Sequence, residues 1–273
     1  MQRLNQTRTL ALLISPAVIF MVVFFVVPLF YLLSQSLYTE EIGYGIHGYA
    51  EFFGSRTSRI VYWRTLRLGL LITFICAVIA YPASFVIARA PLRYRSLAMS
   101  LVILPLMTNA VARTYAWLII LGRQGILNRT LEFTRIIDEP VRLIFTEQAI
   151  VLGLSQLFLP LMVLPLVSAM ENIPDDVIEA ARSLGANQFT AFMRVVVPMS
   201  ADGLVLGATL VFTGSVTAYV TPAILGGSRT LLLSTLLYQR AVTLADINRG
   251  AVVAVVMIVT TLAVNLALRI LRR

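Results

Sequence analysis

Lysine is absent from this chain of 273 residues, so all 22 of its basic residues are arginine. A P-loop needs a lysine at the phosphates, and the chain therefore does not bind ATP in that way. Cysteine and histidine occur once each, as Cys76 and His47. These two residues cannot build a disulfide or a metal site. We expect Cys76, which lies in an apolar run, to be a small packing residue.

Charged residues are also scarce, at 13% of the chain, while hydrophobic residues make up 59% and the mean hydropathy is +0.87. A soluble domain is closer to half apolar, so the composition predicts a membrane protein. The net charge of +9 would suit nucleic acid in a polar chain. In a chain this apolar, anionic lipid headgroups are the better partner for the arginines.

Apolar runs of about 20 residues are long enough to cross a bilayer. The first run is too long for the core of a signal peptide and has no evident cleavage site, so we expect it to be retained. Proline recurs within the runs and predicts kinked helices. The sequence therefore predicts an all-α membrane protein, a single domain over residues 1–273 with six spans and both termini on one side. The expected spans are 10–33, 68–88, 97–121, 146–170, 203–225 and 250–268.

The arginine distribution does not decide which side faces the cytoplasm. On this layout, ten arginines lie on the face that holds the termini and the remaining twelve of 22 lie on the other. Arginines in the shortest loop and at both ends favour cytoplasmic termini. Between the last two spans, residues 230–244 are apolar but short. We expect an interfacial helix there, with a partial seventh span as the alternative.

The longest polar interruption in the C-terminal half runs from Glu171 to Pro198. Pro174 and the two aspartates that follow it favour the start of a helix. Gly185 can take the left-handed conformation that ends one, and Asn187 can cap a second. The stretch therefore predicts two short helices around a glycine turn. The apolar side of the first helix would hold Val177, Ile178, Ala181 and Leu184. The second would carry Phe189, Phe192 and Met193, with its aromatic residues directed outward.

A spaced motif lies inside this interruption. Glu179-Ala180-Ala181 is followed after three residues by Gly185 and after nine more by Val195-Val196-Val197-Pro198. This arrangement resembles the cytoplasmic signature loop of permease subunits in bacterial ABC importers, which reads E-A-A, three residues, G, nine residues, I-x-L-P. Val195 and Val197 stand where the family usually has Ile and Leu, which keeps the apolar character. The alternative is a solvated helical linker between two spans.

Other segments extend the resemblance over roughly residues 10–270. Four segments look like the third-span region of spermidine/putrescine permeases: Pro105–Asn109, Arg113–Trp117, Leu121–Arg123 and Gly125–Asn128. Leu159–Leu166 resembles their fourth span, and Tyr219–Gly227 is similar to a segment shared with relatives for opines and other small solutes. These segments point to the polyamine-type branch of the family.

The resemblance implies a type I importer in the bacterial inner (plasma) membrane, in which this chain is a transport subunit and not an enzyme. Two permease subunits, identical or sisters, would form the path for a polyamine or a related organic solute. Two ATPase subunits would bind ATP and Mg and dock on the cytoplasmic loops, and a periplasmic or tethered binding protein would deliver the solute. The coupling residues implied by the motif are Glu179, Ala180, Ala181, Gly185, Asn187 and Phe189.

The apolar runs of all six spans lack Asp and Glu. An ion-coupled secondary transporter, the main alternative, usually needs a buried carboxylate or a broken-helix ion site. A membrane enzyme would need paired carboxylates, a metal cluster or a nucleophile with its base, which the spans also lack. Aromatic faces can contact a cationic solute, with packing or interface anchoring as the alternative. Candidate pathway residues are Tyr115, Trp117, Phe212, Tyr219 and Arg113, the last of which would otherwise snorkel to the outer interface.

Overall fold

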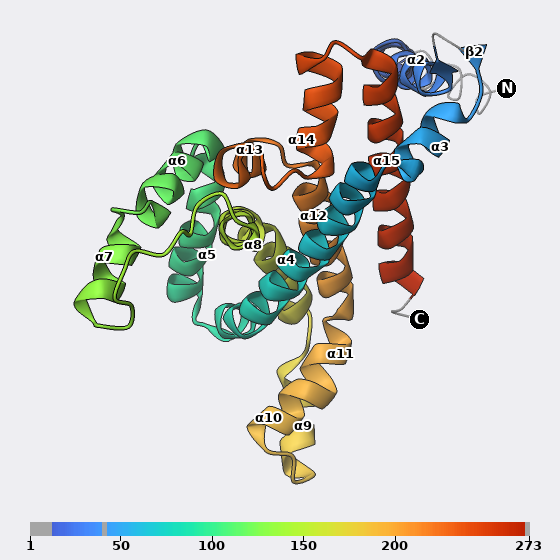
Figure 1. Cartoon of the computed structure of the whole chain (residues 1–273). Coiled ribbons are helices and arrows are strands. Elements are labelled where there is room, and N and C mark those ends of the chain that lie inside the picture. The colour runs from blue at the N-terminus through green and yellow to red at the C-terminus, as the bar shows by residue number, and fades with distance from the viewer. Residues whose placement is uncertain (1–12, 40–42, 271–273) are drawn as a thin grey trace, which may run out of the picture. The chain divides into compact units, whose positions relative to one another are not determined.

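The computed structural model describes residues 13–39 and 43–270, and helices dominate it (Figure 1). A first helix runs from Leu13 to Ser36 and contains the π-helical segment η1 (Val22–Val26) and α2 (Val27–Ser36). The remaining elements are β1 (Tyr38–Thr39), β2 (Gly43–Tyr44), α3 (His47–Gly54), α4 (Arg56–Arg89), α5 (Leu92–Met107), α6 (Ala110–Leu121), α7 (Ile126–Phe133), α8 (Glu147–Glu171), α9 (Asp175–Ser183), α10 (Gln188–Ala191), η2 (Phe192–Val196), α11 (Val197–Met199), α12 (Ala201–Thr217), α13 (Val220–Gly226), α14 (Leu233–Tyr238), η3 (Gln239–Thr243) and α15 (Ile247–Ile270).

The chain divides into two compact units. The first consists of Met1–Arg59 with Leu237–Val256, and the second of Ile60–Leu236 with Met257–Arg273. In the first unit, the short strands β1 and β2 pair antiparallel. Arg249 forms ion pairs with Glu51 and Asp246 there, and a cleft of about 680 Å³ lies beside them.

Within the described residues, four helices are long and apolar enough to cross a membrane: Leu13–Ser36, α4, α8 and α15. The number rises to six if each of two bent pairs forms one span. The bends are 92° between α5 and Ala110–Phe133, and 68° between Gln188–Met199 and α12. Helices therefore cover all six predicted runs, except that residues 10–12 of the first run lie outside the described residues.

The predicted third and fifth spans are not continuous helices, which corrects the sequence-based expectation. The third breaks at Thr108, whose backbone is extended, and Asn109 restarts the helix because its side chain accepts hydrogen bonds from Val111 N and Ala112 N. The fifth breaks between α12 and α13 at Ala218, where ψ is 125°. Ser234 Oγ donates to the Ala218 carbonyl at 2.7 Å, so a neighbouring helix satisfies a backbone group freed by the break.

The predicted polar loop 122–145 also contains a helix, α7, that composition did not indicate. Asn128 is buried within it. Its amide nitrogen donates to the carbonyls of Gly122 and Val141, and its oxygen accepts from Val141 N. The buried side chain of Asn128 thus holds the two ends of this loop together. The predicted short helix over 230–244 is present as α14 and η3.

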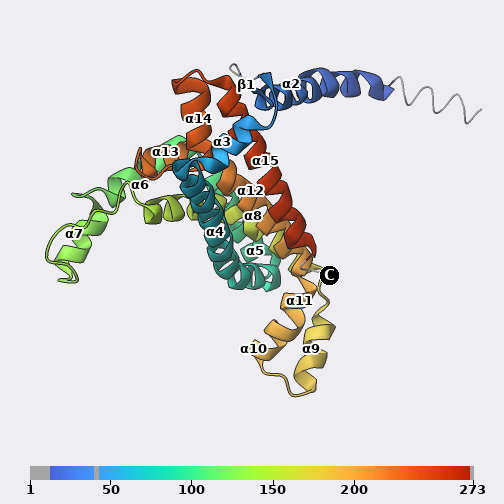
Figure 2. The same cartoon turned by 45° about the vertical axis from the view of Figure 1, so that its right-hand side comes forward.

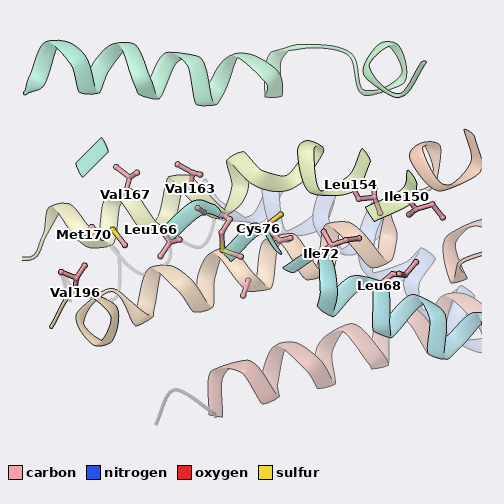
Figure 3. Close-up of a cluster of buried hydrophobic side chains, with 14 of the residues drawn as sticks. Leu68, Ile72, Cys76, Ile150, Leu154, Val163, Leu166, Val167, Met170 and Val196 are labelled. Atoms are coloured by element: carbon pink, nitrogen blue, oxygen red, sulfur yellow. The ribbon is translucent and has the colours of Figure 1, made fainter. Parts of the chain in front are cut away.

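The core of the second unit forms between α4 and α8 (Figure 3). Cys76 is buried there among apolar side chains, as the sequence predicted. The third helix that contributes to this core is α12. It approaches α8 closely through two glycines one turn apart. A Cβ on Gly203 would lie 2.5 Å from the Pro165 carbonyl oxygen, and one on Gly207 would lie 2.7 Å from Met162 Sδ. Small residues at this spacing are typical of close helix packing in membranes.

Candidate functional site

The helix α9 begins and ends as its sequence predicts. Pro174 is the N-terminal cap residue, with φ −60° and ψ 140°, and two aspartates occupy the first turn, where the positive end of the helix dipole favours them. Gly185 has φ +89°. The Gly185 amide donates to the Arg182 carbonyl and the Ala186 amide donates to the Ala181 carbonyl. This pair of bonds is a Schellman cap, so the predicted glycine turn is confirmed.

The positive φ of Gly185 can be tested by substitution. A Cβ at this position would meet nothing within 4 Å, so only the positive φ opposes a side chain. We expect Gly185→Ala to destabilise the turn by about 1 kcal/mol, and Gly185→Val to destabilise it more, because a β-branched side chain is strained further in this region. Solute uptake at matched membrane levels measures the effect. Ala186→Val adds the same side chain at the next residue, where φ is not positive, and serves as the control. Full uptake and assembly with Gly185→Val would contradict the role of the turn.

The second short helix is capped by Asn187, whose side-chain oxygen accepts from Thr190 N at 2.7 Å, as predicted. Its aromatic residues do not all point outward. Phe189 is 69% exposed, but Phe192 faces α4, with ring centroids 5.2 Å from Phe85 and 6.2 Å from Tyr81. The outward prediction for Phe192 was therefore wrong, because its position one turn further along meets the aromatic face of α4.

Apolar side chains are exposed on the segment Glu171–Pro198, which we call the α9–α10 loop. Figures 1 and 2 both place α9 and α10 beyond the end of α8, next to each other. We define the α9–α10 surface by Val177, Glu179, Leu184 and Phe189. Leu184, which directly follows the last residue of α9, is 89% exposed, and Glu179 within α9 is exposed as well. The predicted apolar side of α9 is split, because Ile178 packs instead against the core. Large apolar side chains exposed in a polar loop are typical of a site for a protein partner.

Two of the predicted coupling residues, Ala180 and Ala181, contribute backbone groups and only small side chains. Ala180 is exposed and Ala181 is half-buried. The carbonyls of both accept hydrogen bonds that end α9, from Leu184 N and Ala186 N. Small side chains here leave the surface of α9 open between Glu179 and Leu184.

Comparison with known families decides what kind of chain this is. Residues 80–273 match the family described as binding-protein-dependent transport system inner membrane component. The chain belongs to this family. It is a permease subunit of an ABC importer, a multi-pass protein of the inner membrane, and the family match includes the whole α9–α10 loop.

The most similar relatives of this permease include two curated proteins named spermidine/putrescine transport system permease protein PotB. The one from Haemophilus influenzae is 35% identical over 228 residues, covering 81% of this chain and 79% of that protein. The one from Escherichia coli is 32% identical over 191 residues, covering 70% of each. The fold is similar to that of a bacterial alginate ABC transporter solved in complex with an alginate pentasaccharide-bound periplasmic protein, with TM-score 0.83, 16% identity, and 100% and 96% of the two chains covered.

Sequence reasoning did not find the polar contacts that hold the base of this loop. Arg89 pairs with Asp175, and Arg95 pairs with Glu171. The two arginines flank the turn between α4 and α5, because Arg89 is the last residue of α4 and Arg95 lies in the first turn of α5, and both come about 80 residues before their partners. The only signal in the sequence was the crowding of arginine in that turn, because side chains so far apart give no periodic pattern.

The candidate pathway residues of the permease lie in different surroundings. Tyr115 is exposed on α6, whereas Trp117 is half-buried against Leu121 and its neighbours. Phe212 is fully buried and packs against Gly69 of α4. This position agrees with the alternative that Phe212 is a packing residue and does not line the pathway. Tyr219 is half-buried at the break between α12 and α13.

Arg113 is half-buried on α6. Its Nε and Nη1 atoms are buried and have no hydrogen-bond partner among the described residues. The next residue, Thr114, hydrogen-bonds Thr221 of α13 at 3.0 Å, so the second halves of the two broken spans are joined beside this guanidinium.

Proposed function

We propose that this permease subunit moves spermidine, putrescine or a related organic solute into the cytoplasm. Similarity to the two PotB proteins over most of the chain carries the proposal. The apolar runs of the spans contain no carboxylate that would hold a polyamine tightly. Selection would therefore rest with a separate solute-binding protein, and the spans would supply a path of low affinity lined in part by aromatic faces.

The proposed assembly contains a second permease subunit, identical or a sister, two ATPase subunits and a periplasmic or tethered solute-binding protein. The ATPase subunits would bind ATP and Mg, consistent with the absence of lysine from this chain. They would dock on the α9–α10 surface, whose exposed Leu184 and Phe189 have the apolar character of a partner contact. The coupling residues would then be Glu179, Ala180, Ala181, Gly185, Asn187 and Phe189.

Uptake of radiolabelled spermidine and putrescine by cells that carry the complete operon tests this function. We expect uptake to require the permease and to persist when a protonophore collapses the proton gradient while ATP is maintained. Competition with unlabelled opines and other small solutes defines the range of solutes that the transporter accepts. Loss of uptake with the gradient at constant ATP would support an ion-coupled transporter instead, and uptake of neither polyamine would overturn the proposed solute.

We further propose that the termini and the turn between α4 and α5 are cytoplasmic. The ion pairs of Arg89 and Arg95 support this orientation, because they tie the turn to the base of the α9–α10 loop, where the ATPase subunits would dock. The charge distribution alone left the two sides nearly equal.

Cysteine labelling measures this orientation. With Cys76→Ala as background, Arg93→Cys places one thiol in the exposed α4–α5 turn. We expect an impermeant maleimide to label it only after the membrane is opened with detergent. Labelling in intact cells would reverse the proposed orientation.

A further inference from the structure

The C-terminal end of α4 contacts both ends of the α9–α10 loop. Tyr81, Phe85 and Arg89 follow each other at intervals of four residues and so lie on one face of the helix. We call these three residues the α4 stripe. Arg89 meets the segment that enters the loop, and the two aromatic residues meet the segment that leaves it.

Arg89 binds the entering segment through several groups. Its guanidinium forms an ion pair with Asp175 in the first turn of α9. It also donates to the carbonyl of Ile173 at 2.9 Å and to that of Met170 at 3.4 Å, which lie at or just past the end of α8, where carbonyls lack helical partners. The Arg89 side chain is only 24% exposed. Charged hydrogen bonds are stronger than neutral ones, so this contact fixes the start of α9 on α4.

The leaving segment is held by aromatic packing and one hydroxyl. Phe192 packs edge-on against Phe85 and lies against Tyr81. The Tyr81 hydroxyl accepts from Ser200 Oγ at 3.3 Å and lies 3.5 Å from the Val197 carbonyl. Both ends of the loop thus rest on one rigid face, although α4 lies far from them in sequence.

We propose that the α4 stripe is the contact through which movement of the α9–α10 loop reaches α4. α8 and α12 are continuous with the loop through short connections and receive its displacement directly. α4 has no such connection along the chain. It packs against α8 and α12 through the core, and the stripe is where α4 contacts the α9–α10 loop itself, with the Arg95–Glu171 pair of α5 and α8 beside it. The stripe residues are positioning residues, and this inference rests on the proposed docking of ATPase subunits on the loop.

The test compares Arg89→Gln with Arg93→Gln in the complete transporter. Arg93 lies four residues further on, in the first turn of α5, is exposed, and has no ion pair in the part of the chain described by the structure. Its change therefore removes the same charge close to Arg89 without breaking an ion pair. Spermidine uptake and phosphate release are measured in the same right-side-out vesicles, loaded with ATP and supplied with the solute-binding protein outside, together with recovery of the ATPase subunit by pull-down. We expect Arg89→Gln to keep wild-type recovery and lower uptake per ATP hydrolysed about tenfold, within the range of measured coupling between sites, and Arg93→Gln to change neither.

A charge exchange separates coupling from folding. Arg89→Asp and Asp175→Arg should each lower the uptake per ATP, and the double variant should recover part of it, because the ion pair of the stripe is re-formed with its signs reversed. A wild-type ratio for Arg89→Gln would overturn the inference, as would a loss of uptake that only follows loss of ATPase recovery. Absence of ATPase recovery with the wild-type permease would instead overturn the proposed function, and the inference with it.

Discussion

Glu179→Ala is expected to abolish recovery of the ATPase subunit while leaving the permease folded in the membrane. Glu179 is exposed in the middle of α9, beyond the first turn in which the helix dipole would stabilise its charge. Its removal should therefore change folding by no more than about 0.5 kcal/mol. If the carboxylate meets a basic group in a partly desolvated partner groove, its loss costs about 2–5 kcal/mol of binding, which is about 30-fold or more in affinity.

Pull-down at matched membrane levels, together with polyamine uptake, measures this effect. Glu139→Ala removes an exposed carboxylate from the loop before α8 and should change neither quantity. Glu179→Gln distinguishes the physical cause, because it is mild where hydrogen bonding dominates and as severe as Ala where charge does. Wild-type recovery and wild-type uptake with Glu179→Ala would mean that the α9–α10 loop is only a linker between spans.

Gly203→Val is expected to remove most of the folded permease. The Cβ of any side chain at this position would lie 2.5 Å from the Pro165 carbonyl oxygen, 2.7 Å from Ala169 Cβ and 3.1 Å from Leu166 Cα. Two of these atoms belong to the backbone of α8 and cannot turn away as a flexible side chain would. Overpacking of this kind typically costs 1–3 kcal/mol and sometimes more, and we expect about 3 kcal/mol or above for a branched side chain.

The amount of permease in the membrane and its melting temperature in detergent measure the change. Gly54→Val adds the same side chain to a helical glycine whose Cβ would meet nothing within 4 Å, so it should leave both near wild type. Gly203→Ala should fall between them. A wild-type melting temperature for Gly203→Val would show that α12 does not approach α8 as closely as described.

The sequence predicted the local structure of the α9–α10 loop well, because its signals are local. Gly185 needs a positive φ, Asn187 caps the helix that follows it, and the aspartates stabilise the start of α9. Each effect depends on residues within four positions. Phe192 was predicted wrongly because its environment is set by Phe85 of α4, far away in sequence.

The breaks in the third and fifth predicted spans were hidden by composition. Apolar residues run through both breaks, and hydropathy does not register a change in backbone direction. Asn109 lies in a segment that resembles the third span of spermidine/putrescine permeases. Its capacity to cap a helix was the physical signal for the break in that span. Gly203 and Gly207 were likewise visible as two small residues one turn apart, which predicts a close helix contact. The arginine contacts of Arg89 and Arg95 required the fold itself.

The length of α4 separates two electrostatic environments. Near its beginning, Arg64 and Arg67 pair with Glu147, and at its end Arg89 pairs with Asp175. The interval from Arg64 to Arg89 corresponds to about 37 Å of helix, more than the roughly 30 Å of a bilayer's hydrocarbon core. The helix is therefore long enough to place the two sets of ion pairs in different aqueous compartments, as the predicted span requires. Dissolved ions screen charges over about 10 Å at 0.1 M, so salt added to one compartment weakens the pairs at one end of α4 and leaves those at the other end unchanged.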